Sequence, residues 1–89
     1  MGKMVMLERQ LKAVANRKRL EILQELKKHR TLFSSDIAHS IGMSRAATSQ
    51  HLRILRNAGI VEYTKRGLEV NYRISLDQEP PVQAVLRQL

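Results

Sequence analysis

The side chains best suited to chemistry lie on one face of a predicted helix, residues 45–58. At 100° per residue, Thr48, Leu52 and Leu55 share one side of this helix. The opposite side is small, polar and cationic, and it comprises Ala46, Ser49, Gln50, Arg53 and Asn57. Arginine and glutamine present paired hydrogen-bonding groups that fit base edges in the DNA major groove, and short neighbours permit a close approach. This face therefore predicts recognition of double-stranded DNA.

Further candidate DNA contacts flank this face. Ser44 is a predicted N-cap, and a helix N-terminus favours anions, so Ser44 and Arg45 join the predicted DNA-binding residues. Lys65 and Arg66 lie at a predicted hairpin turn, where long cations can follow phosphates or enter a minor groove. Three more residues are candidate phosphate contacts: His51, Arg56 and Arg73. For His51, a hydrogen bond inside the core is the open alternative.

Other kinds of chemistry lack the residues they need. The chain has no cysteine, which removes disulfides, thiolate metal ligands and thiol nucleophiles. Its histidines, at positions 29, 39 and 51, have no metal-ligand spacing, so we predict no metal site and no cofactor. We identify no nucleophile with an adjacent base and no pair of carboxylates suited to a cleft, and we do not expect an enzyme.

The balance of charge points to the same class of partner. The 89 residues include 16 Lys and Arg against 8 Asp and Glu, a formal net charge of +8, which favours a polyanion such as nucleic acid. No acidic residue occurs from Ile37 to Val61. The basic clusters at 17–19 and 27–30 fit either phosphate contacts or a solvated helix surface. No apolar run resembles a signal peptide or a membrane span, so we expect a cytoplasmic protein with no membrane partner.

Hydrophobic periodicity predicts the elements that position these residues. Helices are expected over residues 3–15 and 17–28, followed by an extended link at 31–33 and a short helix that Gly42 ends. Two β-favouring runs, 60–64 and 70–75, predict a basic hairpin. We therefore predict a mainly α domain with a small β-hairpin, a dimeric winged helix-turn-helix. Its predicted parts are an N-terminal dimerisation helix (1–16), a helix-turn-helix (34–58), a wing (60–76) and a short C-terminal helix (82–89).

Two apolar stripes predict that the chain forms a homodimer. A domain of this size buries only a modest fraction of its surface, so an exposed stripe on a terminal helix favours self-association. The predicted dimerisation residues are Met4, Leu7, Leu11 and Val14 near the N-terminus and Val85, Leu86 and Leu89 near the C-terminus.

Several motifs together resemble the arsenical-resistance-repressor (ArsR) family of winged-helix regulators over roughly residues 7–76. They are Leu20-x-Ile22-Leu23, Asp36-Ile37-Ala38, Ile41-Gly42-Met43-Ser44, Ser49-x-His51-Leu52-x-x-Leu55-x-x-Ala58-Gly59-Ile60-Val61 and Gly67-x-x-x-Asn71-Tyr72-Arg73-Ile74. The resemblance implies a dimer held by its first and last helices, with helix 45–57 in the major groove and the hairpin on the flanking minor groove or phosphates.

The resemblance leaves the effector open. Many members of the family bind metal through Cys-x-Cys on the third helix, but residues 33–36 offer no soft ligand here. Others use a His and carboxylate set on the last helix, and residues 82–89 contain none. The leading expectation is a sequence-specific transcriptional repressor. The alternatives are an effector-sensing switch, responding to a metal or a small molecule, and a non-specific DNA-binding or protein-interaction module. An interaction module would carry an apolar patch in place of the polar face.

Overall fold

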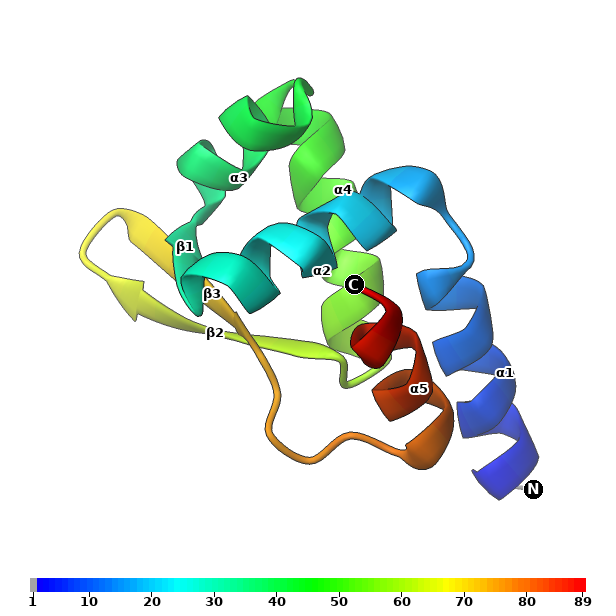
Figure 1. Ribbon diagram of the computed structural model, residues 1–89. Helices are drawn as coiled ribbons and strands as arrows, with labels where there is room; N and C mark the ends of the chain where they lie inside the picture. Colours follow the sequence, from blue (N-terminus) through cyan, green and yellow to red (C-terminus); the bar gives the residue numbers. More distant parts are fainter. Residues whose placement is uncertain (1) are drawn as a thin grey trace.

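The computed structural model describes residues 2–89, so residue 1 of the predicted N-terminal segment lies outside the described residues. The elements are α1 (Gly2–Val14), α2 (Arg17–His29), β1 (Thr31–Phe33), α3 (Ser34–Ile41), α4 (Arg45–Asn57), β2 (Val61–Arg66), β3 (Glu69–Ile74) and α5 (Pro80–Gln88). Figure 1 shows α1 and α5 together at one side of α2, with the β2–β3 hairpin projecting at the other. This is a winged helix-turn-helix, which confirms the predicted fold class.

The turn between α3 and α4 sets the orientation of the polar helix α4. Gly42 has φ of +67°, a left-handed conformation that glycine adopts without strain. The Met43 amide donates to the Ala38 carbonyl at 3.1 Å and closes the C-terminus of α3. The Ser44 hydroxyl oxygen then accepts a hydrogen bond from the Ala47 amide at 3.1 Å. Ser44 is therefore the N-cap that the sequence predicted, and such a cap stabilises a helix by about 1 kcal/mol.

A third strand corrects the prediction for residues 31–33, which were expected to be only an extended link. They form β1 and pair with β3 in an antiparallel sheet of order β1–β3–β2, with Leu32 opposite Tyr72. A three-residue segment is too short to show strand periodicity, so this pairing could not be predicted from local pattern. The added strand joins the base of the wing to the end of α2.

The hairpin turn is tighter than predicted. β2 and β3 pair from Val61–Ile74 to Arg66–Glu69, which leaves a loop of two residues, Gly67 and Leu68. Gly67 has φ of +63°, the positive value that the first position of a type II′ hairpin loop requires. The residues predicted at the turn, Lys65 and Arg66, therefore lie within β2, where the pleat fixes the face that each side chain occupies.

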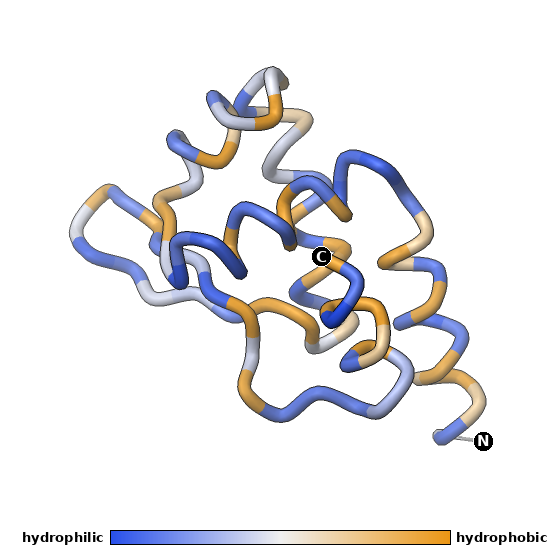
Figure 2. Tube along the Cα trace, viewed as in Figure 1, coloured by the Kyte–Doolittle hydropathy of each residue, from blue (hydrophilic) through white to orange (hydrophobic). Residues whose placement is uncertain are grey.

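The core lies between the helices and the inner side of the sheet. From α4 it includes Thr48, Leu52 and Leu55, the stripe that helical spacing predicted. The Thr48 hydroxyl donates to the Ser44 carbonyl at 2.8 Å, so this buried polar group is paired. Figure 2 shows that hydrophobic residues gather where the elements meet and that they also recur along α1. The exposed side of α4 is thus fixed by what its other side buries.

The C-terminal helix starts earlier than predicted. α5 begins at Pro80, because proline is tolerated in the first turn of a helix, and not at residue 82. Val82 is buried, and Lys27 of α2 donates to the Leu86 carbonyl at 2.8 Å. Gln78 ties down the preceding loop, since its amide donates to the Ser75 carbonyl at 2.6 Å and to the Ile60 carbonyl at 3.0 Å. α5 therefore packs on α1 and α2.

Candidate nucleic-acid interface

One continuous face of α4 is exposed and polar. Among the predicted DNA-binding residues, the structure places five on this exposed surface: Arg45, Ala46, Ser49, Gln50 and Arg53. The buried stripe points the other way, so these side chains cannot turn into the core. The first backbone amides of α4 have no partner inside the helix, and a helix N-terminus with unpaired amides suits a phosphate. Ser44 stands at that terminus as its N-cap.

The far end of α4 is joined to the wing by aromatic contacts. The Arg56 guanidinium carbon lies 5.1 Å from the centre of the Tyr63 ring, a cation–π contact between α4 and β2. Tyr63 lies opposite Tyr72, and their ring centres are 5.6 Å apart. Burial raises the pKa of Tyr72, against the opposing effect of the Arg56 charge. Sequence reasoning proposed Arg56 as a phosphate contact but missed this tyrosine pair, which the alternation of the two strands could have indicated.

The two cations of the wing occupy different faces. Lys65 lies opposite Val70, on the face that carries Tyr63 and is therefore turned toward α4. Arg66 lies opposite Glu69 on the other face, where opposite charges across two strands attract each other. Of the two, Lys65 is the cation on the side of the polar helix.

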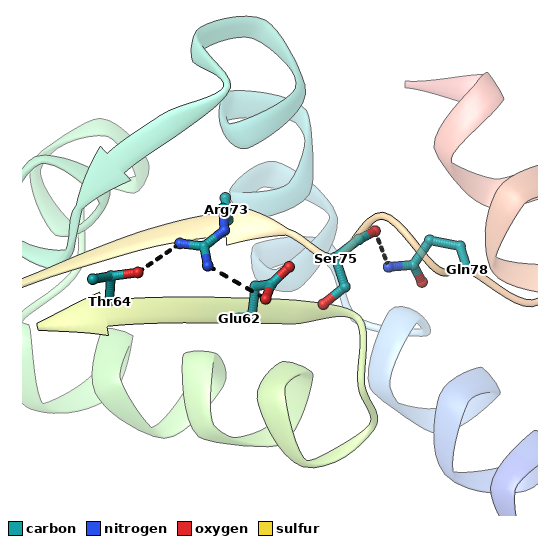
Figure 3. Close-up of polar contacts among 5 residues, drawn as sticks. All are labelled: Glu62, Thr64, Arg73, Ser75 and Gln78. Carbon is teal, nitrogen blue, oxygen red and sulfur yellow. Dashed lines mark hydrogen bonds and ion pairs between the residues drawn. The ribbon is translucent and has the colours of Figure 1, made fainter.

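Arg73 is engaged within the sheet. Its guanidinium donates to the Thr64 hydroxyl at 2.8 Å and to the Glu62 carboxylate at 3.4 Å, as Figure 3 shows. These contacts hold Arg73 on the face away from α4, with a carboxylate beside it that repels phosphate. The predicted phosphate contact of Arg73 would have to compete with these cross-strand partners, which a single sequence did not reveal.

His51 bonds inside the protomer, which favours the second of its two predicted roles. Its Nδ1 lies 3.1 Å from Nη1 of Arg19 on α2. Burial, and then the Arg19 charge, lower the pKa of His51 below its ordinary value of 6.5. Arg19 also donates to the Ala13 carbonyl at 2.6 Å and to the Lys12 carbonyl at 3.3 Å. No sequence signal pointed to this role of Arg19, which stood only within a basic cluster.

The apolar surface of α1 differs from the prediction in one residue. Met4, Leu7 and Leu11 are 81%, 38% and 46% exposed. Val14 is only 6% exposed and packs in the core of its own protomer, which corrects its assignment to the dimerisation surface. The apolar residues predicted on α5 share half-buried positions against the core: Val85, Leu86 and Leu89. An exposed apolar strip thus remains along α1.

The part of the chain that the structure describes was compared with what a metal site and a membrane span require. Within residues 2–89, no three His, Asp or Glu side chains come together as a metal site would require. Among the described helices, none combines the length and the apolar character needed to cross a bilayer.

Comparison with protein families gives a match over the same elements. Residues 16–63 match the model of the family described as "bacterial regulatory protein, arsR family". The matched region runs from the N-cap of α2 into β2 and contains α3, α4 and the turn between them. It includes every predicted contact of the polar helix.

Two regulators are similar in sequence. A cadmium resistance transcriptional regulatory protein, a CadC homolog of Staphylococcus aureus, is 40% identical over 74 residues, which are 83% of this chain and 60% of that protein. The transcriptional repressor PagR of Bacillus anthracis is 32% identical over 79 residues, or 89% of this chain and 76% of PagR. This chain therefore spans 60% of the first relative and 76% of the second.

A solved structure shows the same architecture. The homodimeric winged helix-turn-helix DNA-binding domain of Mb0332 from Mycobacterium bovis, a possible ArsR-family transcriptional regulator, is similar with a TM-score of 0.79 at 30% identity. The match covers 96% of this chain and 72% of that one.

Proposed function

Because the chain belongs to the arsR family of bacterial regulatory proteins, we propose that it is a transcriptional repressor that binds a pseudo-palindromic DNA duplex as a homodimer. It acts by binding and not by catalysis, in the cytoplasm, where bacterial DNA lies. α4 enters the major groove, and the wing contacts the flanking phosphates or minor groove. Repression follows from occupying DNA that polymerase needs.

The exposed polar face of α4 carries this proposal. Gln50 and Arg53 are exposed about one helical turn apart, and each presents paired groups suited to adenine and guanine edges respectively. Ala46 and Ser49, which precede them on the same exposed face, have short side chains that permit a close approach to the bases. Acidic residues are absent from position 37 to position 61, so α4 itself carries no carboxylate that would repel a phosphate.

The contacts to the backbone come from the ends of this face. The N-terminus of α4, with Ser44 and Arg45, supplies amides, a hydroxyl and a cation to one phosphate strand. Lys65 on the wing supplies a second cation. Arg56, near the C-terminal end of α4, stacks on Tyr63 of the wing and supplies a third. Arg66 is the weaker candidate, because Glu69 lies across from it.

The exposed strip on α1 supports the proposed homodimer. Met4, Leu7 and Leu11 form an apolar surface that a second copy would cover, with the half-buried residues of α5 beside it. Mb0332, which has the same fold, is homodimeric. Two copies related by a twofold axis would place two α4 helices on successive major grooves, which predicts a palindromic site.

A soft metal does not fit this chain as an effector. The sequence has no cysteine, and residues 33–36 of the third helix region offer no thiolate. Within residues 2–89, the His and carboxylate side chains form no group that could replace one. We therefore propose that DNA binding requires no bound metal.

A binding experiment tests the proposed function. Duplexes that the protein selects from a random pool are compared with scrambled duplexes of equal composition in gel shifts across a salt series. We expect preference of about a thousandfold or more for the selected sequence. Equal affinity for both duplexes would instead make the chain a non-specific DNA-binding module.

A further inference from the structure

Arg19 joins three helices through one guanidinium. Its Nε and Nη2 donate to the carbonyls of Ala13 and Lys12 at the end of α1, at 2.6 and 3.3 Å. Its Nη1 lies 3.1 Å from Nδ1 of His51, in the middle of α4. The last carbonyls of a helix carry partial negative charge, so a cation is favoured there. Arg19 of α2 thus fixes the end of α1 against the recognition helix.

This link requires one protonation state of His51. A guanidinium has donors only, so the Nδ1 atom of His51 must accept, and the ring is neutral with its proton on Nε2. Protonation would turn Nδ1 into a donor and place a second positive charge beside Arg19. Both changes break the bond, and the charges would then repel each other. Burial and the Arg19 charge already disfavour the protonated ring.

The surroundings do not offer His51 a compensating anion. The groove beside the link is lined by Glu8, Arg9 and Lys12 of α1, and Glu8 lies 3.8 Å from Lys12. The carboxylates on the other elements packed against α4 are paired or exposed: Glu21 lies 3.5 Å from Lys18, Glu25 accepts a hydrogen bond from Ser40, Glu62 pairs with Arg73, and Asp36 is exposed. Lys18 also donates to the Ile41 carbonyl, His39 is exposed, and the ring of Tyr63 lies under the Arg56 guanidinium. Cations therefore outnumber anions at this groove.

A second hydrogen bond joins α1 to α4, and neither of its groups is ionisable. The buried side-chain amide of Gln10 donates to the Ala58 carbonyl at the end of α4, at 3.3 Å. Loss of the Arg19–His51 bond would therefore leave α4 held by its buried stripe and by Gln10 at its C-terminal end, but without the polar tie that joins its middle to α1 and α2. A change of helix orientation, and not unfolding, is the expected consequence.

We propose that Arg19 is a positioning residue that holds the DNA-reading helix α4 in register with α1, and that it does so only while His51 is neutral. This inference rests on the proposed function, because α1 is the helix that we propose contacts the second protomer. Two α4 helices must keep a fixed spacing to occupy two half-sites. Acidification would release that spacing and weaken binding to the operator.

A titration of the free protein tests the link without DNA. Imidazole resonances are followed by NMR in the wild type and in Arg19→Gln, with circular dichroism to check that the variant is folded. We expect the pKa of His51 to lie below 6.5 in the wild type and to rise in Arg19→Gln, because the positive charge beside the ring is gone. An unchanged pKa would overturn the link. If Arg19→Gln does not fold, Arg19→Met, which keeps an unbranched apolar stem but has neither the charge nor a donor, takes its place.

Operator binding then tests the consequence. For each protein we take the ratio of affinities at about pH 7.5 and about pH 5.5, on either side of the ordinary histidine pKa. His51→Asn offers a neutral acceptor near the position of Nδ1 and cannot titrate. The wild type and the matched control His39→Asn should lose about fivefold or more relative to His51→Asn, the lower end of typical coupling between sites. Equal ratios in all three proteins would overturn the proposal. A wild type that binds no duplex at neutral pH would instead refute the proposed function, while the NMR titration would still decide the link.

Discussion

The guanidinium of Arg56 lies over the ring of Tyr63, 5.1 Å from its centre, and so joins the end of α4 to β2, the first strand of the wing. A guanidinium that stacks on an aromatic ring can still donate hydrogen bonds from its edge, so this contact is compatible with binding a phosphate. It also fixes the wing relative to α4, since Tyr63 is itself packed against Tyr72. The two elements proposed to contact DNA are thus one surface.

The Arg56–Tyr63 contact predicts a measurable coupling energy. In a double-mutant cycle of Arg56→Ala and Tyr63→Leu, denaturant unfolding should give a coupling of about 0.5–1 kcal/mol, the range for exposed cation–π pairs. Arg45→Ala at the opposite end of α4 serves as the control, and its effect should add to that of Tyr63→Leu. Additivity in the Arg56 cycle as well would show that the stacking contributes nothing.

The two cations of the wing should differ in their effect on DNA binding. Lys65→Ala should weaken binding to every duplex and lower the slope of log affinity against log salt by about 0.9 per phosphate contact, or about 1.8 for a dimer. Arg66→Ala should change the slope less, because Arg66 faces Glu69 on the side away from α4. A larger change for Arg66→Ala would show that the wing approaches DNA with its other face.

Two substitutions on α1 should separate dimerisation from folding. Leu11→Glu places a charge on the exposed apolar strip and should shift sedimentation from dimer to monomer at tens of micromolar, with the fold retained. Val14→Ala removes buried methyl groups and should lower the free energy of unfolding by about 1–2 kcal/mol. A wild type that sediments as a monomer at the same concentration would contradict the proposed dimer.

Stability should fall on mild acidification because of His51. Its pKa is lowered in the folded protein, so the unfolded chain binds more protons at pH values between the folded pKa and 6.5. This contribution is fully present above pH 6.5 and is lost as the pH falls through the lowered pKa. Thermal unfolding of the wild type should therefore lose stability over that window relative to His51→Asn. Parallel pH profiles of the two proteins would contradict this assignment.

Features set by local sequence could be predicted, and features set by distant contacts could not. The polar face of α4 follows from helical spacing, and the caps at Gly42 and Ser44 follow from residue type, so both were predicted. The burial of Val14 depends on where α2 and α4 pack, which a stripe on one helix does not reveal. The hairpin strands were predicted, but the exact length of the turn, and so the positions of Lys65 and Arg66, depended on register.

The candidate site shows the same division. Exposure of Gln50 and Arg53 followed from the position of the buried stripe. The partners of Arg73 and His51 come from another strand and another helix, and a single sequence does not reveal those pairings. In the sequence, Arg19 is one of three consecutive cations, and only the structure shows that its side chain makes three contacts with α1 and α4.

Whether α4 reads DNA sequence is tested most directly by measuring how strongly Gln50→Ala and Arg53→Ala prefer the selected duplex over the scrambled one. Each substitution should reduce the preference for the selected duplex by about 1–3 kcal/mol for each base that the side chain reads, with a smaller effect on the scrambled duplex. Lys65→Ala, measured alongside, should lower both affinities alike. If Gln50→Ala and Arg53→Ala weakened both duplexes equally while Lys65→Ala abolished the preference, the exposed face of α4 would not be the reading surface.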